Sequence, residues 1–203
     1  MIKAVIFDVG GVLIRTQDHS HRREWEQILG LDERESEEIV FNSEMGQKAQ
    51  KGEISDQQLW AWVDERLNLG DRLEAFRDGF WAGDQLDMTL ISYIQSLRPK
   101  YQTAIISNAT DGLRNSLTNE HKISRAFDLI IGSAEEKTMK PDHKIYWLAL
   151  KRLGRHPNEA VFIDDFAQNI RAAQEVGMAT IHYQPGIHIP AELAKLGVIT
   201  GDE

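Results

Sequence analysis

The sequence contains no cysteine, no long apolar run and no excess of basic residues. The missing thiols exclude disulfides, Cys-ligated zinc, iron–sulfur clusters and thiol nucleophiles. No stretch reaches the ~18–20 apolar residues of a membrane span, and Asp8 interrupts the short apolar run at the N-terminus, which makes a poor signal peptide. We therefore expect a soluble, cytoplasmic protein.

Acidic residues outnumber basic ones by 32 to 23 among 203 residues, so the formal net charge is −9. The excess is local, because residues 15–88 hold 18 acidic and 9 basic side chains and the remainder holds 14 of each. Affinity for nucleic acid or anionic lipid requires clustered Lys and Arg. The charge therefore argues against nucleic-acid and membrane partners, and the length favours one domain, with or without an insertion.

Five short apolar runs are typical of buried strands, at 2–7, 103–107, 127–132, 160–164 and 179–183. Helical patterns separate several of them. One covers 141–153, where the proline suits a first turn, and another covers 166–176 and stops at Gly177. Strands that alternate with helices predict an α/β fold with a parallel sheet covered on both faces. Residues from Pro185 onward are expected to form a short, loosely held tail.

The segment 15–88 breaks this alternation. It has no convincing strand, it holds four of the five tryptophans, and two of its patterns fit the capping-box spacing: Asp32 with Glu35 and Ser55 with Gln58. We expect a small helical domain whose tryptophans form its core. The polar, glycine-punctuated stretch 41–55 is predicted to be a loop between two helices.

Side chains that suit phosphate or metal binding stand at the carboxyl ends of the predicted strands or at the entrance of a helix. They are Asp8 at the end of the first run, Ser107 and Asn108 at the end of the second, Lys140 before a helix, and Asp164 with Asp165 at the end of a later run. Ligands of parallel α/β sheets bind beyond the carboxyl ends of the strands. A carboxylate nucleophile, hydroxyl and amide donors, a lysine and an acidic pair suit phosphoryl transfer assisted by Mg²⁺.

Four stretches carry a resemblance to a known family: IFDVGGVLI at 6–14, AIISNAT at 104–110, KPDHKIY at 140–146 and VFIDDFAQNI at 161–170. In this order they resemble the haloacid dehalogenase (HAD) superfamily of phosphohydrolases. The more local likeness is to its capped small phosphatases with a paired aspartate in the fourth motif, which include sugar-1-phosphatases and epoxide hydrolase N-terminal domains. The resemblance implies a Rossmann-like α/β core at 1–14 and 89–203 with an all-helical cap domain inserted at 15–88.

The resemblance also implies a role for each motif residue. Asp8 would be the nucleophile that becomes an aspartyl-phosphate, and Lys140 would neutralise charge beside it. The Mg²⁺ ligands would be Asp8, the backbone carbonyl of Gly10, Asp165 and Asp164. The phosphate would be held by Ser107, Asn108, Gly11 and Lys140, and Asn169 would support these groups from behind.

One position departs from the family pattern. The common first motif is Asp-x-Asp, whose second aspartate is the general acid and base, and here that position is Gly10. Loss of acid–base help is worth ~10²–10⁴ in rate. His19 and His21 could supply a substitute proton carrier, but two solvated histidines on a polar helix face are the favoured interpretation.

The residues and the resemblance together predict a Mg²⁺-dependent phosphatase that hydrolyses a small phosphomonoester, such as a sugar phosphate. Two alternatives stay open: a 2-haloacid dehalogenase, in which the same aspartate displaces halide, and a catalytically weak binding or regulatory protein, which Gly10 supports. Candidate specificity residues are Glu44, Gln47 and Lys48 in the predicted loop. Because an acidic lid disfavours polyanions, the expected substrate is a singly phosphorylated metabolite, and the chain is expected to be a monomer or homodimer.

Overall fold

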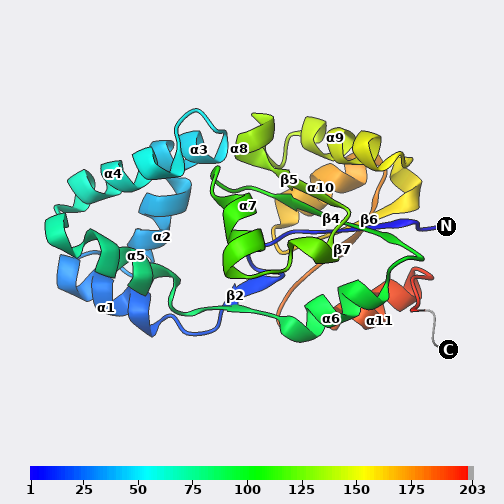
Figure 1. The fold of residues 1–203 in the computed structure, drawn as a ribbon, viewed down its shortest axis with the longest axis horizontal. Coiled ribbons are helices and arrows are strands. Elements are labelled where there is room, and N and C mark those ends of the chain that lie inside the picture. Colours follow the sequence, from blue (N-terminus) through cyan, green and yellow to red (C-terminus); the bar gives the residue numbers. More distant parts are fainter. Residues whose placement is uncertain (201–203) are drawn as a thin grey trace.

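A five-stranded parallel sheet is the centre of the fold. The structure is a computed structural model that describes residues 1–200 (Figure 1). The strand order is β5-β4-β1-β6-β7, and every neighbouring pair is parallel. The strands are β1 (Ala4–Phe7), β4 (Gln102–Ser107), β5 (Leu129–Gly132), β6 (Ala160–Asp164) and β7 (Ala179–His182). All five predicted strands are confirmed, with ends that shift by one or two residues.

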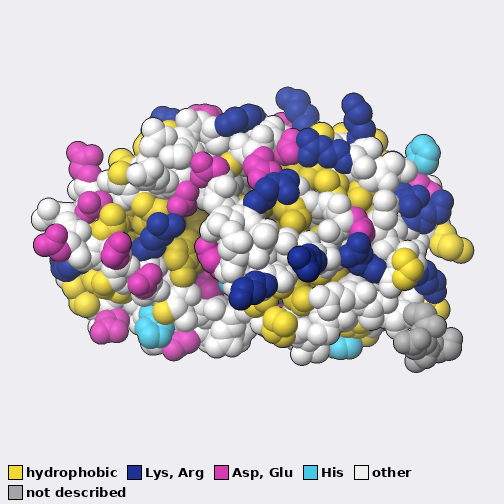
Figure 2. Space-filling view, in the orientation of Figure 1, with side chains coloured by type: hydrophobic (Ala, Val, Ile, Leu, Met, Phe, Trp, Pro, Cys, Tyr) yellow, Lys and Arg dark blue, Asp and Glu magenta, His cyan; other side chains and the backbone are white. Residues whose placement is uncertain are grey.

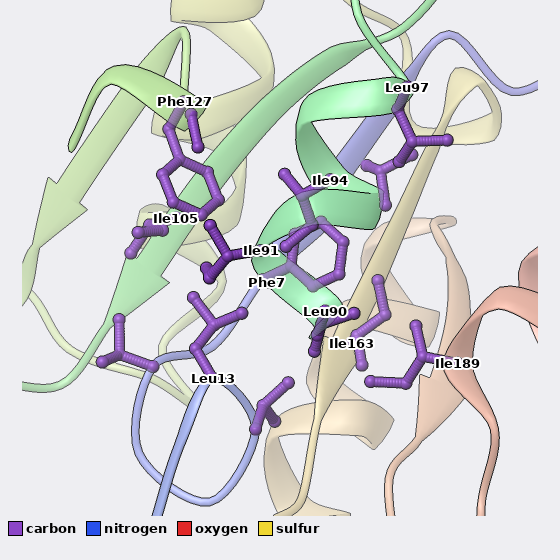
Figure 3. Packing of buried hydrophobic residues seen from close by; sticks show 14 of the residues in the cluster. Phe7, Leu13, Leu90, Ile91, Ile94, Leu97, Ile105, Phe127, Ile163 and Ile189 are labelled. Atoms are coloured by element: carbon purple, nitrogen blue, oxygen red, sulfur yellow. The ribbon is translucent and has the colours of Figure 1, made fainter. Parts of the chain in front are cut away.

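Helices cover both faces of this sheet, which is why its strands are continuous apolar runs rather than alternating ones. One face packs against α6 (Met88–Ser96) and α11 (Ile189–Lys195), and the other packs against α9 (His143–Leu153) and α10 (Ala167–Val176). Phe7 of β1 points into the first cluster, among Ile91 and Ile94 of α6 (Figure 3). Its neighbour Ile6 belongs to the second cluster, as expected for successive side chains on a strand.

Shorter elements complete this α/β part of the chain. They are α7 (Leu113–Asn115), a π-helical turn η3 (Ser116–Glu120), a 3₁₀ turn η4 (Ser124–Ala126), α8 (Ser133–Glu136) and a 3₁₀ turn η5 (Pro157–Glu159). In Figure 1, α7 and α8 lie between the sheet and the helices of residues 15–88.

The helices of residues 15–88 have an apolar cluster of their own. The elements are α1 (Ser20–Leu29), α2 (Glu35–Glu37), the π-helical turn η1 (Glu38–Asn42), α3 (Glu44–Gln50), α4 (Asp56–Leu67), the 3₁₀ turn η2 (Gly70–Arg72) and α5 (Leu73–Trp81). Their cluster includes Trp60, Phe76 and Phe80, with Trp25 packed against it. Acidic side chains are frequent on this part of the surface, whereas Lys and Arg are more frequent over the sheet domain (Figure 2). The exact domain boundary at 14/15 and 88/89 stays a prediction.

The prediction that 15–88 contains no strand was wrong at its two ends. Strands β2 (Ile14–Thr16) and β3 (Asp84–Leu86) pair antiparallel and form a two-stranded connection to the helices. The Thr16 hydroxyl donates to Asp84 Oδ1 at 2.6 Å across this pair. Each strand is three residues long and only half-buried, so neither carries the apolar pattern by which strands are recognised.

Two predicted helix starts also need correction. Helix α9 begins at His143, with Asp142 as its cap, because Asp142 Oδ1 accepts the backbone N–H of Lys144 at 2.9 Å. Pro141 therefore precedes the helix rather than lying in its first turn. Helix α2 begins at Glu35, so Asp32 is not its cap, although the Glu35 side chain accepts the Asp32 N–H.

The capping box at the start of α4 is confirmed. The Ser55 hydroxyl accepts the Gln58 N–H at 3.2 Å, and the Gln58 side chain accepts the Ser55 N–H at 2.8 Å. Each side chain thereby satisfies a backbone donor that the first turn leaves unpaired. This fixes the residue at which α4 begins, Asp56.

Two segments expected to be irregular contain helices. Within the predicted loop 41–55, α3 begins after Ser43, whose hydroxyl accepts the Gly46 N–H at 3.0 Å. The predicted loose tail contains α11, and it packs onto the sheet domain through Ile189, Leu193 and Val198. Within residues 1–200, none of the helices has the length and apolar character that crossing a membrane requires.

Phe76→Ala tests whether the helices of 15–88 unfold as a unit. Phe76 is fully buried, and its ring lies 5.5 Å from that of Trp25 and 6.2 Å from that of Phe80. We expect a loss of about 3–5 kcal/mol in local stability because the cavity cannot fill completely. Hydrogen exchange should quicken in residues 20–81, while the sheet strands stay protected.

The matched control is Asp78→Ala, an exposed position on the same helix beyond its first turn, which should leave exchange unchanged. Equal loss of protection in the sheet and in 20–81 would contradict a separate domain at 15–88.

Candidate active site

A buried lysine lies between two carboxylates at the carboxyl edge of the sheet. Asp8 follows β1 and Asp164 ends β6, and these two strands are neighbours. Lys140, from the loop before α9, places its Nζ 2.7 Å from Asp8 Oδ1 and 2.7 Å from Asp164 Oδ2. With Asp165, the two aspartates form a group whose carboxylate oxygens lie within 4.8 Å of one another. The structure therefore brings together four of the predicted site residues.

Burial and neighbouring charges together shift the pKa values of Asp8 and Lys140. Desolvation raises the pKa of Asp8 to about 7, against the opposing influence of the Lys140 charge, and the nearby Asp164 charge raises it further. Burial alone would lower the pKa of Lys140, but the two adjacent carboxylates outweigh it and raise that pKa above its ordinary value. Lys140 thus stays charged at neutral pH, and it supplies the positive charge next to Asp8.

Asp164 is held rigidly by donors on several sides. The backbone N–H of Phe166 donates to its Oδ1 at 2.7 Å, and the Asn169 amide lies 3.1 Å from both of its oxygens. Tyr146 in turn donates its hydroxyl to the Asn169 carbonyl at 3.0 Å. Asn169 therefore lies behind the cluster, in the first turn of α10, and orients Asp164.

Asp165 supplies the third carboxylate of the group. Its Oδ1 is buried and has no hydrogen-bond partner among residues 1–200, and burial followed by the Asp164 charge raises its pKa. A buried carboxylate oxygen without a donor is unfavourable. A hard divalent cation that prefers oxygen ligands would satisfy it together with Asp8 and Asp164. The residues present fit such an ion.

Gly11 leaves the space that Asp165 occupies. Its φ is +74°, a left-handed conformation that favours glycine. A Cβ atom at this position would lie 2.1 Å from Asp165 Oδ2, so any other residue would displace the carboxylate. Gly11, predicted to contact phosphate, thus has a second, steric reason to be glycine.

Gly10 differs from Gly11 in its backbone conformation and in the space around it. Its φ is not in the left-handed region. An added Cβ would meet no atom of residues 1–200 within 4 Å, and the residue is exposed. The site therefore has room for a side chain at the position where the family pattern has its second aspartate.

Ser107 is the last residue of β4 and Asn108 follows it, and Asn108 has an additional contact. Ser107 is 4% exposed at the end of β4. The Asn108 amide nitrogen donates to the Lys140 carbonyl at 2.9 Å, and its Oδ1 accepts the Lys140 N–H at 2.8 Å. This pair of bonds fixes the backbone that carries the buried lysine.

The candidate specificity residues have partners inside the insertion. Lys48 pairs with Glu44 at 2.7 Å, and Gln47 donates to the Asn42 carbonyl at 3.1 Å. These contacts neither support nor exclude a role in substrate choice, which stays a prediction. His19 lies against Glu37 at 3.7 Å, on the helical insertion rather than in the carboxylate group.

Two residues of the site were missed by the sequence reasoning. Lys140 Nζ lies 5.4 Å from the centre of the Phe162 ring, which is a cation–π contact. His182 Nε2 lies 2.9 Å from the Asp165 carbonyl oxygen and fixes that turn. His182 ends β7, so the rule that identified Asp8 and Asp164 at strand ends could also have found it.

Comparison with known proteins identifies the family. A model of the haloacid dehalogenase-like hydrolases matches residues 2–177. This chain is a haloacid dehalogenase-like hydrolase. The four motifs that suggested the resemblance all lie within the matched range, and the observed parallel sheet agrees with it.

Relatives across this hydrolase family differ in the reactions that their names state. A sesquiterpene phosphatase from Aspergillus oryzae is 26% identical over 196 residues, which cover 96% of each chain. A D-ribitol-5-phosphate phosphatase from Bacteroides thetaiotaomicron is 24% identical, with 97% of this chain and 98% of that protein covered. An (S)-2-haloacid dehalogenase from Burkholderia cepacia is 33% identical, but only over 40% of this chain and 35% of its own.

A solved structure shares the fold over nearly the whole chain. It is a HAD-family enzyme from Bacteroides thetaiotaomicron, crystallised with magnesium and inorganic phosphate. The TM-score is 0.78 at 22% identity, with 93% of this chain and 97% of that chain covered. The likeness shows that this hydrolase has the HAD fold.

Lys140→Met tests the electrostatic role of the lysine in this hydrolase. Without its charge, Asp8 and Asp164 remain buried with no cation between them. Breaking a buried ion pair in this way costs about 3–5 kcal/mol, so urea denaturation should show that loss in the free energy of unfolding. Lys144→Met, at a side chain that is 83% exposed, is the control and should change little. A Lys140→Met protein as stable as the wild type at pH 8 would contradict this account.

Proposed function

We propose that this hydrolase is a Mg²⁺-dependent phosphatase that acts on a small phosphomonoester, such as a sugar phosphate, with Asp8 as nucleophile. The observation that carries the proposal is the group of Asp8, Asp164 and Asp165 with Lys140 at 2.7 Å from the first two. It joins an oxygen nucleophile, a fixed positive charge and a set of oxygen ligands at one sheet edge.

The relatives favour phosphate esters over other substrates. Two relatives that match over almost all of their own length carry the names of phosphatases, and a structure with the same fold holds magnesium and inorganic phosphate. The relative named a haloacid dehalogenase matches a much smaller part of this chain. These names support a phosphatase, and a sugar or polyol phosphate is the substrate class that the ribitol-5-phosphate enzyme suggests.

The nucleophile would work as follows. An oxygen of Asp8 attacks phosphorus and the new O–P bond forms while the bond from phosphorus to the leaving oxygen breaks. The electron pair goes to the leaving oxygen, which takes a proton from solvent water and departs as the alcohol. Water then attacks the phosphorus of the aspartyl-phosphate, which releases phosphate and restores Asp8. Lys140 stabilises negative charge on the phosphoryl oxygens during both steps.

Mg²⁺ would be held by Asp8, Asp165, Asp164 and the backbone carbonyl of Gly10, and it would supply additional positive charge beside the phosphoryl group. Asp164 already accepts hydrogen bonds from Lys140, Phe166 and Asn169. Asp165 has an unpartnered buried oxygen within residues 1–200. We therefore assign direct coordination first to Asp8 and Asp165. Ser107, the Asn108 backbone and Gly11 would hold the remaining phosphate oxygens.

Gly10 limits what the site does to the leaving group. With glycine in place of the second aspartate, this position has no side chain to protonate the leaving oxygen or to activate water. Phosphates with a good leaving group, such as anomeric sugar phosphates, depend least on that proton in the first step. The proposal therefore favours such substrates over simple alkyl phosphates.

A phosphate-release screen with metal removal tests the function. Sugar phosphates, phosphoglycolate, nucleotides and bisphosphates are assayed with Mg²⁺ and then with EDTA. We expect turnover of a monophosphate that EDTA abolishes and Mg²⁺ restores. Asp8→Asn should reduce it by roughly 10³-fold or more, because the amide is not a nucleophile. Asp78→Asn, an exposed acid of the insertion, is the control and should keep full activity.

Other outcomes of the screen favour the alternatives. Metal-independent halide release from 2-chloropropionate would identify a dehalogenase. Mg²⁺ binding without any turnover would favour a binding or regulatory protein. Preference for a bisphosphate or a long nucleotide would contradict the singly phosphorylated substrate.

Gly10→Asp tests the missing acid and base. The backbone conformation and the open space around Gly10 admit the side chain. If a proton carrier limits the rate, kcat should rise by about 10²-fold. Gly10→Asn has nearly the same shape but cannot transfer the proton, so it is the matched control. An unchanged kcat in a folded Gly10→Asp protein would show that this hydrolase uses another route for the proton.

A further inference from the structure

The first residue of α4 contacts the loop that follows β4 with both its side chain and its backbone. Asp56 Oδ1 accepts the hydroxyl of Thr110 at 2.9 Å, and the Asp56 N–H donates to Asp111 Oδ1 at 2.8 Å. The other Asp56 carboxylate oxygen pairs with Arg77 at 2.9 Å. One residue of the helical insertion thus binds two successive residues of a sheet-domain loop.

A second contact ties the same loop to the insertion through Ser133. This serine follows β5 and is fully buried. Its hydroxyl oxygen accepts the Ala109 N–H at 3.0 Å and donates to the Gln50 carbonyl at 2.6 Å. Residues 109–111 are therefore linked to the insertion at each of three consecutive positions, directly or through one hydroxyl.

The backbones approach closely at this contact. Gly52 has a φ of +66°, and a Cβ there would lie 2.1 Å from the Ala134 carbonyl oxygen. The Lys137 ammonium donates to the Gly52 carbonyl, and the backbone of Lys137 has a left-handed φ of 55°. The segment 50–56 consequently has a defined position against the sheet domain rather than a loose surface contact.

The loop held in this way directly follows Ser107 and Asn108, the residues to which the proposed function gives the phosphate. We propose that Asp56 is a positioning residue for this phosphate-binding loop, and this inference rests on the proposed function. Asp56 would not touch the phosphate. By fixing Thr110 and Asp111, it would keep the donors of the loop oriented before phosphate arrives, so less ordering is needed on binding.

A simpler role for Asp56 must be separated from this one. A carboxylate in the first turn also stabilises α4 through the helix dipole. Loss of stability in an Asp56 variant would therefore not distinguish the two roles. Coupling between Asp56 and Thr110 does distinguish them, because the helix dipole makes no use of the threonine hydroxyl.

The experiment measures binding of inorganic phosphate in the presence of Mg²⁺ by calorimetry. Asp56→Ala and Thr110→Val should each weaken binding by roughly 3- to 10-fold, the worth of about one hydrogen bond. The double variant should bind no more weakly than either single variant. Asp56→Asn retains an acceptor for Thr110 and should recover most of the affinity.

Asp64→Ala is the matched control. Asp64 lies on the same helix and accepts the Gly70 N–H at 2.7 Å, but this contact stays within the insertion. It should change phosphate affinity by less than about twofold. Unchanged affinity in Asp56→Ala, or additive losses in the double variant, would overturn the positioning role.

Hydrogen exchange at residues 109–111 tests the positioning role of Asp56 independently of the proposed phosphatase function. Asp56→Ala should quicken exchange there without phosphate, and Asp64→Ala should not. If the wild-type protein binds no phosphate, the proposed function fails. The exchange result then decides alone whether Asp56 orders the loop, and unchanged exchange at 109–111 refutes it.

Discussion

The rest of the site depends on one ammonium group held between buried carboxylates. Lys140 lies 2.7 Å from both Asp8 and Asp164 and is 2% exposed. Three carboxylates cannot share a desolvated space without compensation, and one lysine compensates only part of their charge. The raised pKa of Asp8 and the Asp165 oxygen without a partner among residues 1–200 both reflect this shortage of positive charge. An additional cation is the simplest way to complete such a site.

The parallel sheet makes this arrangement possible. Neighbouring strands β1 and β6 end at the same edge, so residues far apart in the chain meet with little freedom of position. The groups around them then remove the remaining freedom. Asn108 fixes the Lys140 backbone through two hydrogen bonds, Asn169 orients Asp164, and Gly11 leaves room for Asp165. These contacts therefore restrict the positions of the charged side chains in the site.

The sequence predicted those parts of the fold that have a local cause. Every apolar run became a strand of the sheet, and Gly177 ends α10 with a left-handed φ of 98°. Some errors have a local cause that was overlooked, since Asp142 caps α9 and Ser43 caps α3. The other errors fall where the cause is distant in the sequence. Strands β2 and β3 exist because two segments meet across the whole insertion, and α11 is ordered because the sheet domain covers its apolar side. None of these three elements has a local sequence pattern strong enough to predict its structure.

The sequence by itself determined the chemistry that is available: which acids stand at strand ends, that a lysine accompanies them, that glycine replaces a possible acid and base, and that the acidic excess lies in 15–88. Tertiary structure alone decided how these groups are arranged. It paired Lys140 with Asp8 and Asp164 rather than Asp165, left one Asp165 oxygen free within residues 1–200, and placed Asp56 against Thr110. Such choices depend on distances of a few ångströms between segments remote in sequence, and local propensity does not encode those distances.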